Sequence, residues 1–135
     1  MRYLHRVIFG DTDQMGIVYY ANYYRFFEAA RAEYLRALGK SYRDLVAMDV
    51  ALPVVESHCN YKRPAHFEDV LAIDTHISKL RGASLTFSYE VRRDEVLLAT
   101  GHTTHACIGS NGRPKALPPV FAELLRACVA DVQVM

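Results

Sequence analysis

Two carboxylates, Asp11 and Asp13, stand in a glycine-bordered loop directly before the strongest helical pattern of the chain. The first N–H groups of a helix lack partners within it and carry partial positive charge, equivalent to roughly half an elementary charge. Such an end can polarise a carbonyl group and hold an oxyanion. A carboxylate beside these donors can attack an acyl carbon or direct water to it, so the spacing indicates acyl hydrolysis. A thioester suits this chemistry because its thiolate leaves without a strong acid.

The helix that must position these carboxylates is expected over residues 22–38. Asn22 is a good N-cap residue, and Gly39 is expected to end the helix. Apolar side chains recur at three- and four-residue steps and form one broad stripe for the core, namely Tyr23, Phe26, Phe27, Ala30, Tyr34, Leu35 and Leu38. At about 1.5 Å per residue the helix is roughly 25 Å long, so the domain is expected to be built around it.

The rest of the chain predicts mostly strands. Apolar and polar residues alternate over 84–93, as in an antiparallel strand with one buried face. The order of elements predicts an α+β fold, with one antiparallel sheet of about five strands on one main helix. Residues 1–135 are expected to form a single domain, and the two open sheet edges predict at least a homodimer. The expected strands are 2–9, 52–61, 70–80, 84–93 and 96–108, with a short helix from Ser41 to about Met48 and a C-terminal helix that opens at Pro118-Pro119.

The composition restricts the classes of partner. Lys and Arg total 16 against 15 for Asp and Glu, and there is no basic run, so nucleic acid is not an expected partner. The uninterrupted apolar runs are short, which predicts no membrane span, and charged residues interrupt the N-terminal segment, which argues against a signal peptide. The three cysteines match neither a disulfide framework nor a zinc spacing, and they predict a reducing cytoplasm.

Other site chemistries fit the spacing poorly. The string D-T-D-Q-M-G is similar to the start of an EF-hand loop, but Asn22 stands where that loop requires a bidentate Glu. His102 and His105 lie three apart on an expected strand and so point to opposite faces, and we predict neither a metal nor another cofactor. The sequence has no G-x-S-x-G elbow, no G-x-G-x-x-G and no P-loop. The remaining alternative for Asp11 and Asp13 is a purely structural role before the helix.

The segment G-D-T-D-Q-M-G-I-V-Y-Y-A-N-Y, residues 10–23, resembles the active-site segment of the 4-hydroxybenzoyl-CoA thioesterase family of hot-dog proteins. The likeness includes the bacterial short-chain acyl-CoA thioesterases associated with the Tol-Pal system. It covers nearly the whole chain, with P-V-V-E at 53–56 and Y-K-R-P-A-H-F-E-D-V at 61–70. The resemblance implies a hot-dog fold, an acyl-CoA substrate, and a homodimer or homotetramer with its active site at a subunit interface.

Carried over by position, the resemblance places the catalytic carboxylate at Asp13 and the carbonyl-polarising N–H at Tyr20. Gly16 falls where the loop turns toward the helix, and Asp11 is expected to support the loop. The residues expected to contact CoA or the acyl group are Arg81, Ser84, Arg113, Lys115 and Tyr23.

Two positions depart from the family pattern. Tyr20 stands where many short-chain members have His, and Gln14 stands where the hydroxybenzoyl branch often has Pro. The acyl group is therefore left open between aromatic and aliphatic chains, as is the choice between nucleophile and general base for Asp13. Two other functions keep the fold: hydrolysis of acyl carrier protein thioesters, and non-catalytic binding of acyl thioesters. A dehydratase would pair a His with an acid, and no His occurs between Arg6 and Asp49.

Overall fold

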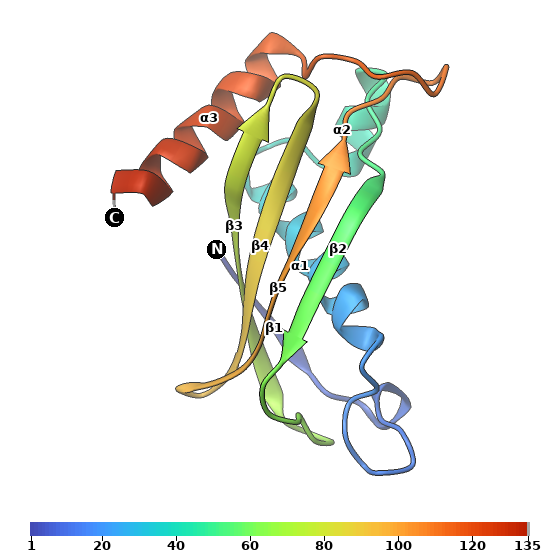
Figure 1. Cartoon of the computed structure of the whole chain (residues 1–135), viewed down its shortest axis with the longest axis vertical. Helices are drawn as coiled ribbons and strands as arrows, with labels where there is room; N and C mark the ends of the chain where they lie inside the picture. The colour runs from blue at the N-terminus through green and yellow to red at the C-terminus, as the bar shows by residue number, and fades with distance from the viewer. Residues whose placement is uncertain (135) are drawn as a thin grey trace.

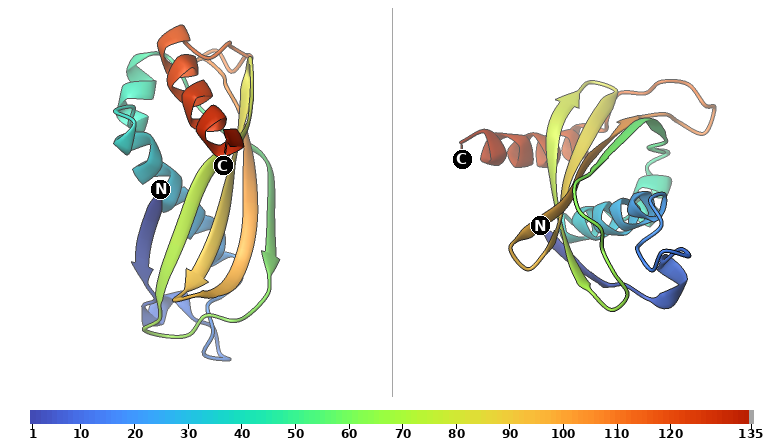
Figure 2. Two further views of the ribbon diagram at one scale, coloured as in Figure 1. Left: turned by 90° about the vertical axis from the view of Figure 1, so that its left-hand side faces the viewer. Right: turned by 60° about the horizontal axis from the view of Figure 1, so that its bottom comes forward.

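A curled antiparallel sheet wraps around one long helix (Figures 1 and 2). The structure, a computed structural model, describes residues 1–134, and the surroundings of side chains as far as Val129. The strands lie in the order β1-β3-β4-β5-β2, so β1 and β2 are the sheet edges. The elements are β1 (Arg2–Arg6), η1 (Phe9–Asp11, a 3-10 turn), α1 (Asn22–Ala37), α2 (Tyr42–Ala47), β2 (Val54–Tyr61), β3 (Val70–Arg81), β4 (Ser84–Arg93), β5 (Val96–Ala106) and α3 (Pro119–Val134).

The apolar stripe of α1 packs on the inner face of the sheet, as the sequence predicts. Phe27 is fully buried, and its ring stacks on Tyr89 of β4 with 4.2 Å between centroids. The predicted alternation of β4 is confirmed, because its inner residues are at most 1 % exposed: Leu85, Phe87, Tyr89 and Val91. Six of the seven predicted stripe residues are buried, and Leu38 is partly buried.

Gly101 of β5 lets α1 lie close to the sheet. A Cβ at this position would sit 2.7 Å from the Phe27 ring and 2.7 Å from the His58 carbonyl oxygen of β2. Real Cβ atoms do not approach other atoms so closely, so a side chain here would push α1 or β2 away. The glycine therefore sets the distance between the central helix and one edge of the sheet.

Several predicted boundaries are wrong. The strand expected from residue 52 begins at Val54, the strand expected to reach residue 108 ends at Ala106, and two further differences have a cause in the hydrogen bonds of Asp11. The first strand ends at Arg6 and not at residue 9, because the Asp11 carboxylate accepts the Ile8 N–H at 2.9 Å and draws the chain into η1. Asn22 is the first residue of α1 and not its N-cap, because its side-chain amide donates to the Asp11 carbonyl at 2.9 Å. The predicted helix end is close: α1 stops at Ala37, and Gly39 has the left-handed φ of 78° expected of a C-terminal glycine.

Arg31 is a buried charged residue that the apolar stripe of α1 does not predict. Arg31 is buried in α1 and donates to the hydroxyls of Tyr42 and Tyr89 at 3.1 and 3.4 Å. His102 and His105 lie on opposite faces of β5, as predicted: His102 lies 3.0 Å from the Glu56 carboxylate on the outer face, whereas His105 is buried.

The C-terminal helix covers the part of β3 that β1 leaves open. β1 pairs only with residues 70–74 of β3, and α3 packs against β3 and extends past it (Figure 1). Within residues 1–134, no helix is both long enough and apolar enough to cross a membrane.

Candidate active site

The segment between β1 and α1 folds into a small hairpin. The Asp13 N–H donates to the Ile17 carbonyl at 2.9 Å, and residues 12 and 18 form an antiparallel bridge. Gly16 turns the chain with a φ of 77° and donates its N–H to the Asp13 carbonyl at 3.0 Å. The half-buried Asp13 keeps a carboxylate oxygen 2.8 Å from the Met15 N–H. The structure therefore gives Asp13 a defined orientation, and Gly16 the turning position that was expected of it.

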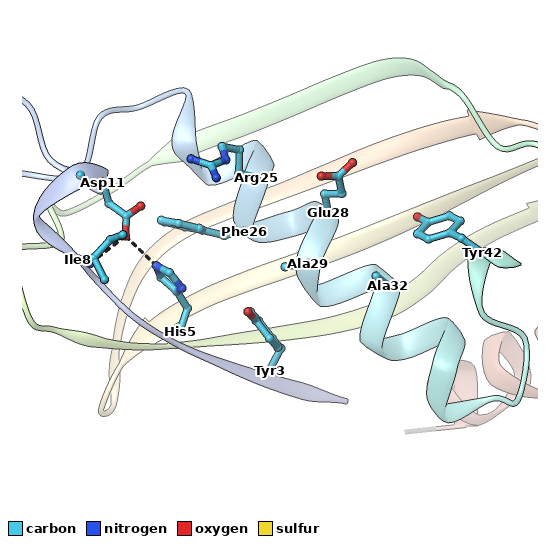
Figure 3. Close-up of a pocket in the computed structure, with 11 residues that line it drawn as sticks. Tyr3, His5, Ile8, Asp11, Arg25, Phe26, Glu28, Ala29, Ala32 and Tyr42 are labelled. Carbon is cyan, nitrogen blue, oxygen red and sulfur yellow. Dashed lines mark hydrogen bonds and ion pairs between the residues drawn. The ribbon is translucent and has the colours of Figure 1, made fainter.

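The buried Asp11 supports this hairpin through hydrogen bonds to the segments on either side of it. It is 4 % exposed, and one of its carboxylate oxygens lies 2.8 Å from His5 Nε2 and also accepts the Ile8 N–H (Figure 3). Its carbonyl accepts the Tyr19 N–H at 2.9 Å as well as the Asn22 side chain. Asp11 thus ties β1, the hairpin and the start of α1 together, which is the supporting role expected of it.

Tyr20 presents an unpaired backbone N–H at the start of α1. The neighbouring Tyr19 N–H is taken by Asp11, but the Tyr20 N–H donates to no acceptor among residues 1–134. The residue as a whole is 60 % exposed. A free amide at a helix start is what an oxyanion or a polarised carbonyl requires.

Tyr20 also lines a cavity of about 330 Å³, whose walls are largely aromatic and apolar groups. Tyr23 forms its inner wall and is buried against Phe26 and Tyr61, and this burial raises the pKa of Tyr23 to about 12. Asp13 does not line the cavity, but it is hydrogen-bonded to Ile17, which does. The complete lining is Ile17, Val18, Tyr20, Tyr23, Tyr61, Lys62, Arg63 and Pro64.

Tyr23 is the one residue of the predicted CoA- and acyl-binding set that lies beside Tyr20, and the other four lie at the other end of the molecule. Arg81 and Ser84 flank the β3–β4 hairpin, which Figure 1 shows at the opposite end of the sheet from the start of α1. The turn that carries Arg113 and Lys115 lies at that same end. The Lys115 ammonium donates to the carbonyls of Met48 and Asp49 at 3.0 and 2.9 Å, so it fastens this turn to the end of α2. Within one chain, these cations do not meet Asp13 and Tyr20.

A larger hollow of about 660 Å³ lies between β1 and α1 (Figure 3). Tyr3 of β1 and Ala29 of α1 line it from opposite sides, the His5 and Phe26 rings meet at one end with 4.5 Å between centroids, and Glu28 lies on its rim. The buried carboxylate of this hollow is Asp11, and one of its oxygens is already hydrogen-bonded to the His5 ring and to the Ile8 N–H. The buried carboxylate of this hollow is therefore already occupied, and the carboxylate that stays open to it is the exposed Glu28.

Comparisons with known proteins decide the family. Residues 7–125 match the thioesterase-like superfamily. The chain belongs to this superfamily. Its five-stranded sheet around one long helix is the hot-dog fold of thioesterases, as predicted. Protein TT1821 of Thermus thermophilus, whose crystal structure is known, has a TM-score of 0.90 and 34 % identity over 94 % of this chain and 98 % of its own.

Relatives with named activities include a bacterial and a cyanobacterial protein. The acyl-CoA thioester hydrolase YbgC of Escherichia coli is 38 % identical over 84 % of this chain and 86 % of its own length. The 1,4-dihydroxy-2-naphthoyl-CoA hydrolase of Nostoc punctiforme is 33 % identical over 97 % of this chain and 90 % of its own. The prediction of a thioester hydrolase agrees with these names, whereas the 4-hydroxybenzoyl-CoA branch stays a prediction.

Sequence reasoning missed the role of the end of β2 and of the residues that follow it. Tyr61, Lys62, Arg63 and Pro64 line the cavity beside Tyr20, and the Val18 N–H donates to the Ala65 carbonyl at 2.9 Å. The Y-K-R-P-A-H run was recognised as part of the family likeness, and it was the available signal. Its proximity to the hairpin depends on contacts across more than 40 residues, which local periodicity does not report.

Proposed function

We propose that this protein hydrolyses acyl-CoA thioesters to the free acid and CoA. Asp13 acts as nucleophile or general base, and the Tyr20 N–H polarises the thioester carbonyl. The observation that carries the proposal is the unpaired N–H of Tyr20, a residue that lines an aromatic-rich cavity together with Ile17 of the Asp13 hairpin. The names of the relatives support CoA thioesters as the substrate class.

The chemistry needs few groups from the chain. Either the Asp13 carboxylate attacks the acyl carbon, or it takes a proton from a water molecule whose oxygen attacks. In both routes negative charge develops on the carbonyl oxygen, where the Tyr20 N–H stabilises it. The C–S bond then breaks and the CoA thiolate leaves. In the general-base route this thiolate takes up the proton held by Asp13, which restores the carboxylate. In the nucleophilic route, water finally hydrolyses the mixed anhydride on Asp13 and restores the carboxylate.

We further propose that the site is completed by a second copy of the chain. β2 is an edge strand, and Val54 and Val55 at its start are 46 % and 62 % exposed. A twofold axis beside β2 pairs it antiparallel with the partner's β2 and covers the open β2 edge of each subunit, while β1 stays an edge strand. Such pairing brings the start of the partner's β2 beside Tyr61 and the cavity at the start of α1.

This pairing would bring the predicted CoA-binding residues of one subunit close to the proposed catalytic residues of the other. Val54 pairs with His105, which also pairs with Leu85, so the start of β2 lies at the Arg81–Ser84 end of the sheet. Antiparallel pairing therefore carries that end of one subunit toward Asp13 and Tyr20 of the other. Arg81, Ser84 and Arg113 would then contact CoA across the interface, while Lys115 holds the turn of Arg113. The three free cysteines support a reducing cytoplasm as the location of this oligomer.

Mixing two inactive variants tests the shared site. Asp13→Asn removes the carboxylate, and Arg81→Glu opposes the CoA phosphates. Co-refolded at equal amounts, these variants should recover about a quarter of wild-type kcat/KM, because half of randomly formed dimers contain one intact site. Each variant refolded alone is the control. Recovery of no activity above the sum of the controls would contradict a site that spans two subunits, and sedimentation of the wild type distinguishes a dimer from a homotetramer.

The substrate class is tested by thiol release from matched donors. Benzoyl, butyryl and octanoyl groups are offered both as CoA thioesters and as acyl carrier protein thioesters. The proposal expects the higher kcat/KM on CoA for every acyl group that reacts. Preference for the carrier protein would favour the alternative donor, and binding without thiol release would favour a non-catalytic module.

A further inference from the structure

We infer that Tyr61 is a positioning residue for the reaction, because its hydroxyl fixes the backbone of Tyr20 from the neighbouring strand. The inference rests on the function proposed above. Tyr61 is the last residue of β2, and its hydroxyl donates to the Tyr20 carbonyl at 3.0 Å. This hydrogen bond joins the end of an edge strand to the entrance of the central helix.

The bond completes a set that holds both peptide groups around Tyr20. On the preceding side, the Tyr19 carbonyl, which shares its peptide group with the Tyr20 N–H, accepts the Asn22 N–H at 2.9 Å. On the following side, the Tyr20 carbonyl accepts the Tyr23 N–H at 3.3 Å and the Tyr61 hydroxyl at 3.0 Å. The Tyr61 bond is the shorter of these two. It also comes from a different element, the edge strand β2, whereas the Tyr23 N–H belongs to α1.

The ring of Tyr61 is itself held in place. It packs edge-to-face on Tyr23, with 5.2 Å between centroids, and Tyr23 is 3 % exposed and part of the core. A second edge contact joins it to Tyr20 at 6.2 Å. Burial, with a contribution from the Cys59 thiol, raises the pKa of Tyr61, so the hydroxyl keeps its proton and donates throughout the neutral range. Tyr61 is therefore a fixed donor, although 43 % of its surface is exposed.

Fixing Tyr20 matters because an oxyanion donor must be aimed in advance. Donors act when they lie about 2.7–3.1 Å from the position that the charged oxygen will take, and reorientation during the reaction costs rate. The charge develops in the transition state, so a looser Tyr20 amide should weaken transition-state binding more than substrate binding. Loss of the Tyr61 hydroxyl is therefore expected to appear in kcat and not in KM.

The test is Tyr61→Phe, which removes the hydroxyl and keeps the ring. The loss of one hydrogen bond should lower kcat for acyl-CoA hydrolysis by about 10-fold while KM changes by less than about 2-fold. Tyr3→Phe is the matched control, because Tyr3 lines the hollow on the β1 side of α1 and lies outside the proposed site. Its kinetic constants should stay at wild-type values. The carbonyl ¹³C resonance of Tyr20 should shift in Tyr61→Phe and stay in Tyr3→Phe.

Each other outcome overturns the inference. If the wild type hydrolyses acyl-CoA and kcat is unchanged in Tyr61→Phe, the inference about Tyr61 is wrong and the proposed function stands. A raised KM with unchanged kcat would mean that Tyr61 contacts the substrate and does not orient the amide. An unmoved Tyr20 carbonyl resonance would mean that the bond does not form in solution. Absence of thiol release from the wild type would end the proposed function, and this inference with it.

Discussion

Replacing Asp13 by Asn is expected to lower kcat for acyl-CoA hydrolysis by about 10²- to 10⁴-fold, because an amide can neither attack the acyl carbon nor accept a proton from water. The fold should persist. The Asn side chain keeps an oxygen that can accept the Met15 N–H, and the backbone bonds of the hairpin do not involve the carboxylate. Thiol release measures the activity, and thermal unfolding confirms that the variant is folded.

The matched control is Asp94→Asn. Asp94 lies in the β4–β5 hairpin with a left-handed φ of 54°, a conformation that Asn also adopts readily. This variant makes the same chemical change away from the proposed site and should retain wild-type kcat. An Asp13→Asn enzyme with wild-type turnover would show that the hairpin carboxylate is structural, which is the alternative that the sequence leaves open.

Replacing Phe27 by Ala is expected to lower the free energy of unfolding by about 3–5 kcal/mol, the usual cost of removing a fully buried aromatic ring. The ring fills the space between α1 and the sheet, stacked on Tyr89 and directly over Gly101. Because Gly101 has no side chain that could move into the cavity, the site has little means of closing. Urea denaturation at one fixed protein concentration measures the change, since oligomer stability depends on concentration.

Phe9→Ala is the control for this stability prediction. Phe9 is 79 % exposed in η1, and its ring meets Phe67 edge-to-face at 5.8 Å. Truncation of so exposed a ring should change the free energy of unfolding by less than about 1 kcal/mol. Equal losses from both variants would mean that Phe27 is not the centre of the core, and the arrangement of α1 on the sheet would need revision.

The core was predictable because periodicity reports burial directly. The stripe of α1 and the alternation of β4 each place apolar residues on one face, and the structure buries both faces against each other. The start of α1 was less predictable. Asn22 has the residue type of an N-cap, but its side chain is drawn to the Asp11 carbonyl, a long-range preference that the local sequence does not encode.

The candidate site likewise contains residues that the local sequence could place and residues that it could not. Asp13, Gly16 and Tyr20 follow one another within a motif, so the resemblance could place them, and the hairpin brings them to the start of α1. Tyr61 joins the site through a bond across 41 residues, and only the sheet topology brings its strand beside Tyr20. Burial of Arg31 was hidden for a similar reason, since its hydroxyl partners come from α2 and β4.

The most direct measurement is the amide ¹H shift of Tyr20 in the Asp13→Asn variant, with acyl-CoA bound and slowly turned over. The account predicts that the Tyr20 N–H moves downfield with acyl-CoA and not with CoA alone, because the thioester carbonyl becomes its acceptor. An unmoved Tyr20 resonance, with the ligand-induced shifts gathered around His5 in the hollow between β1 and α1, would contradict it.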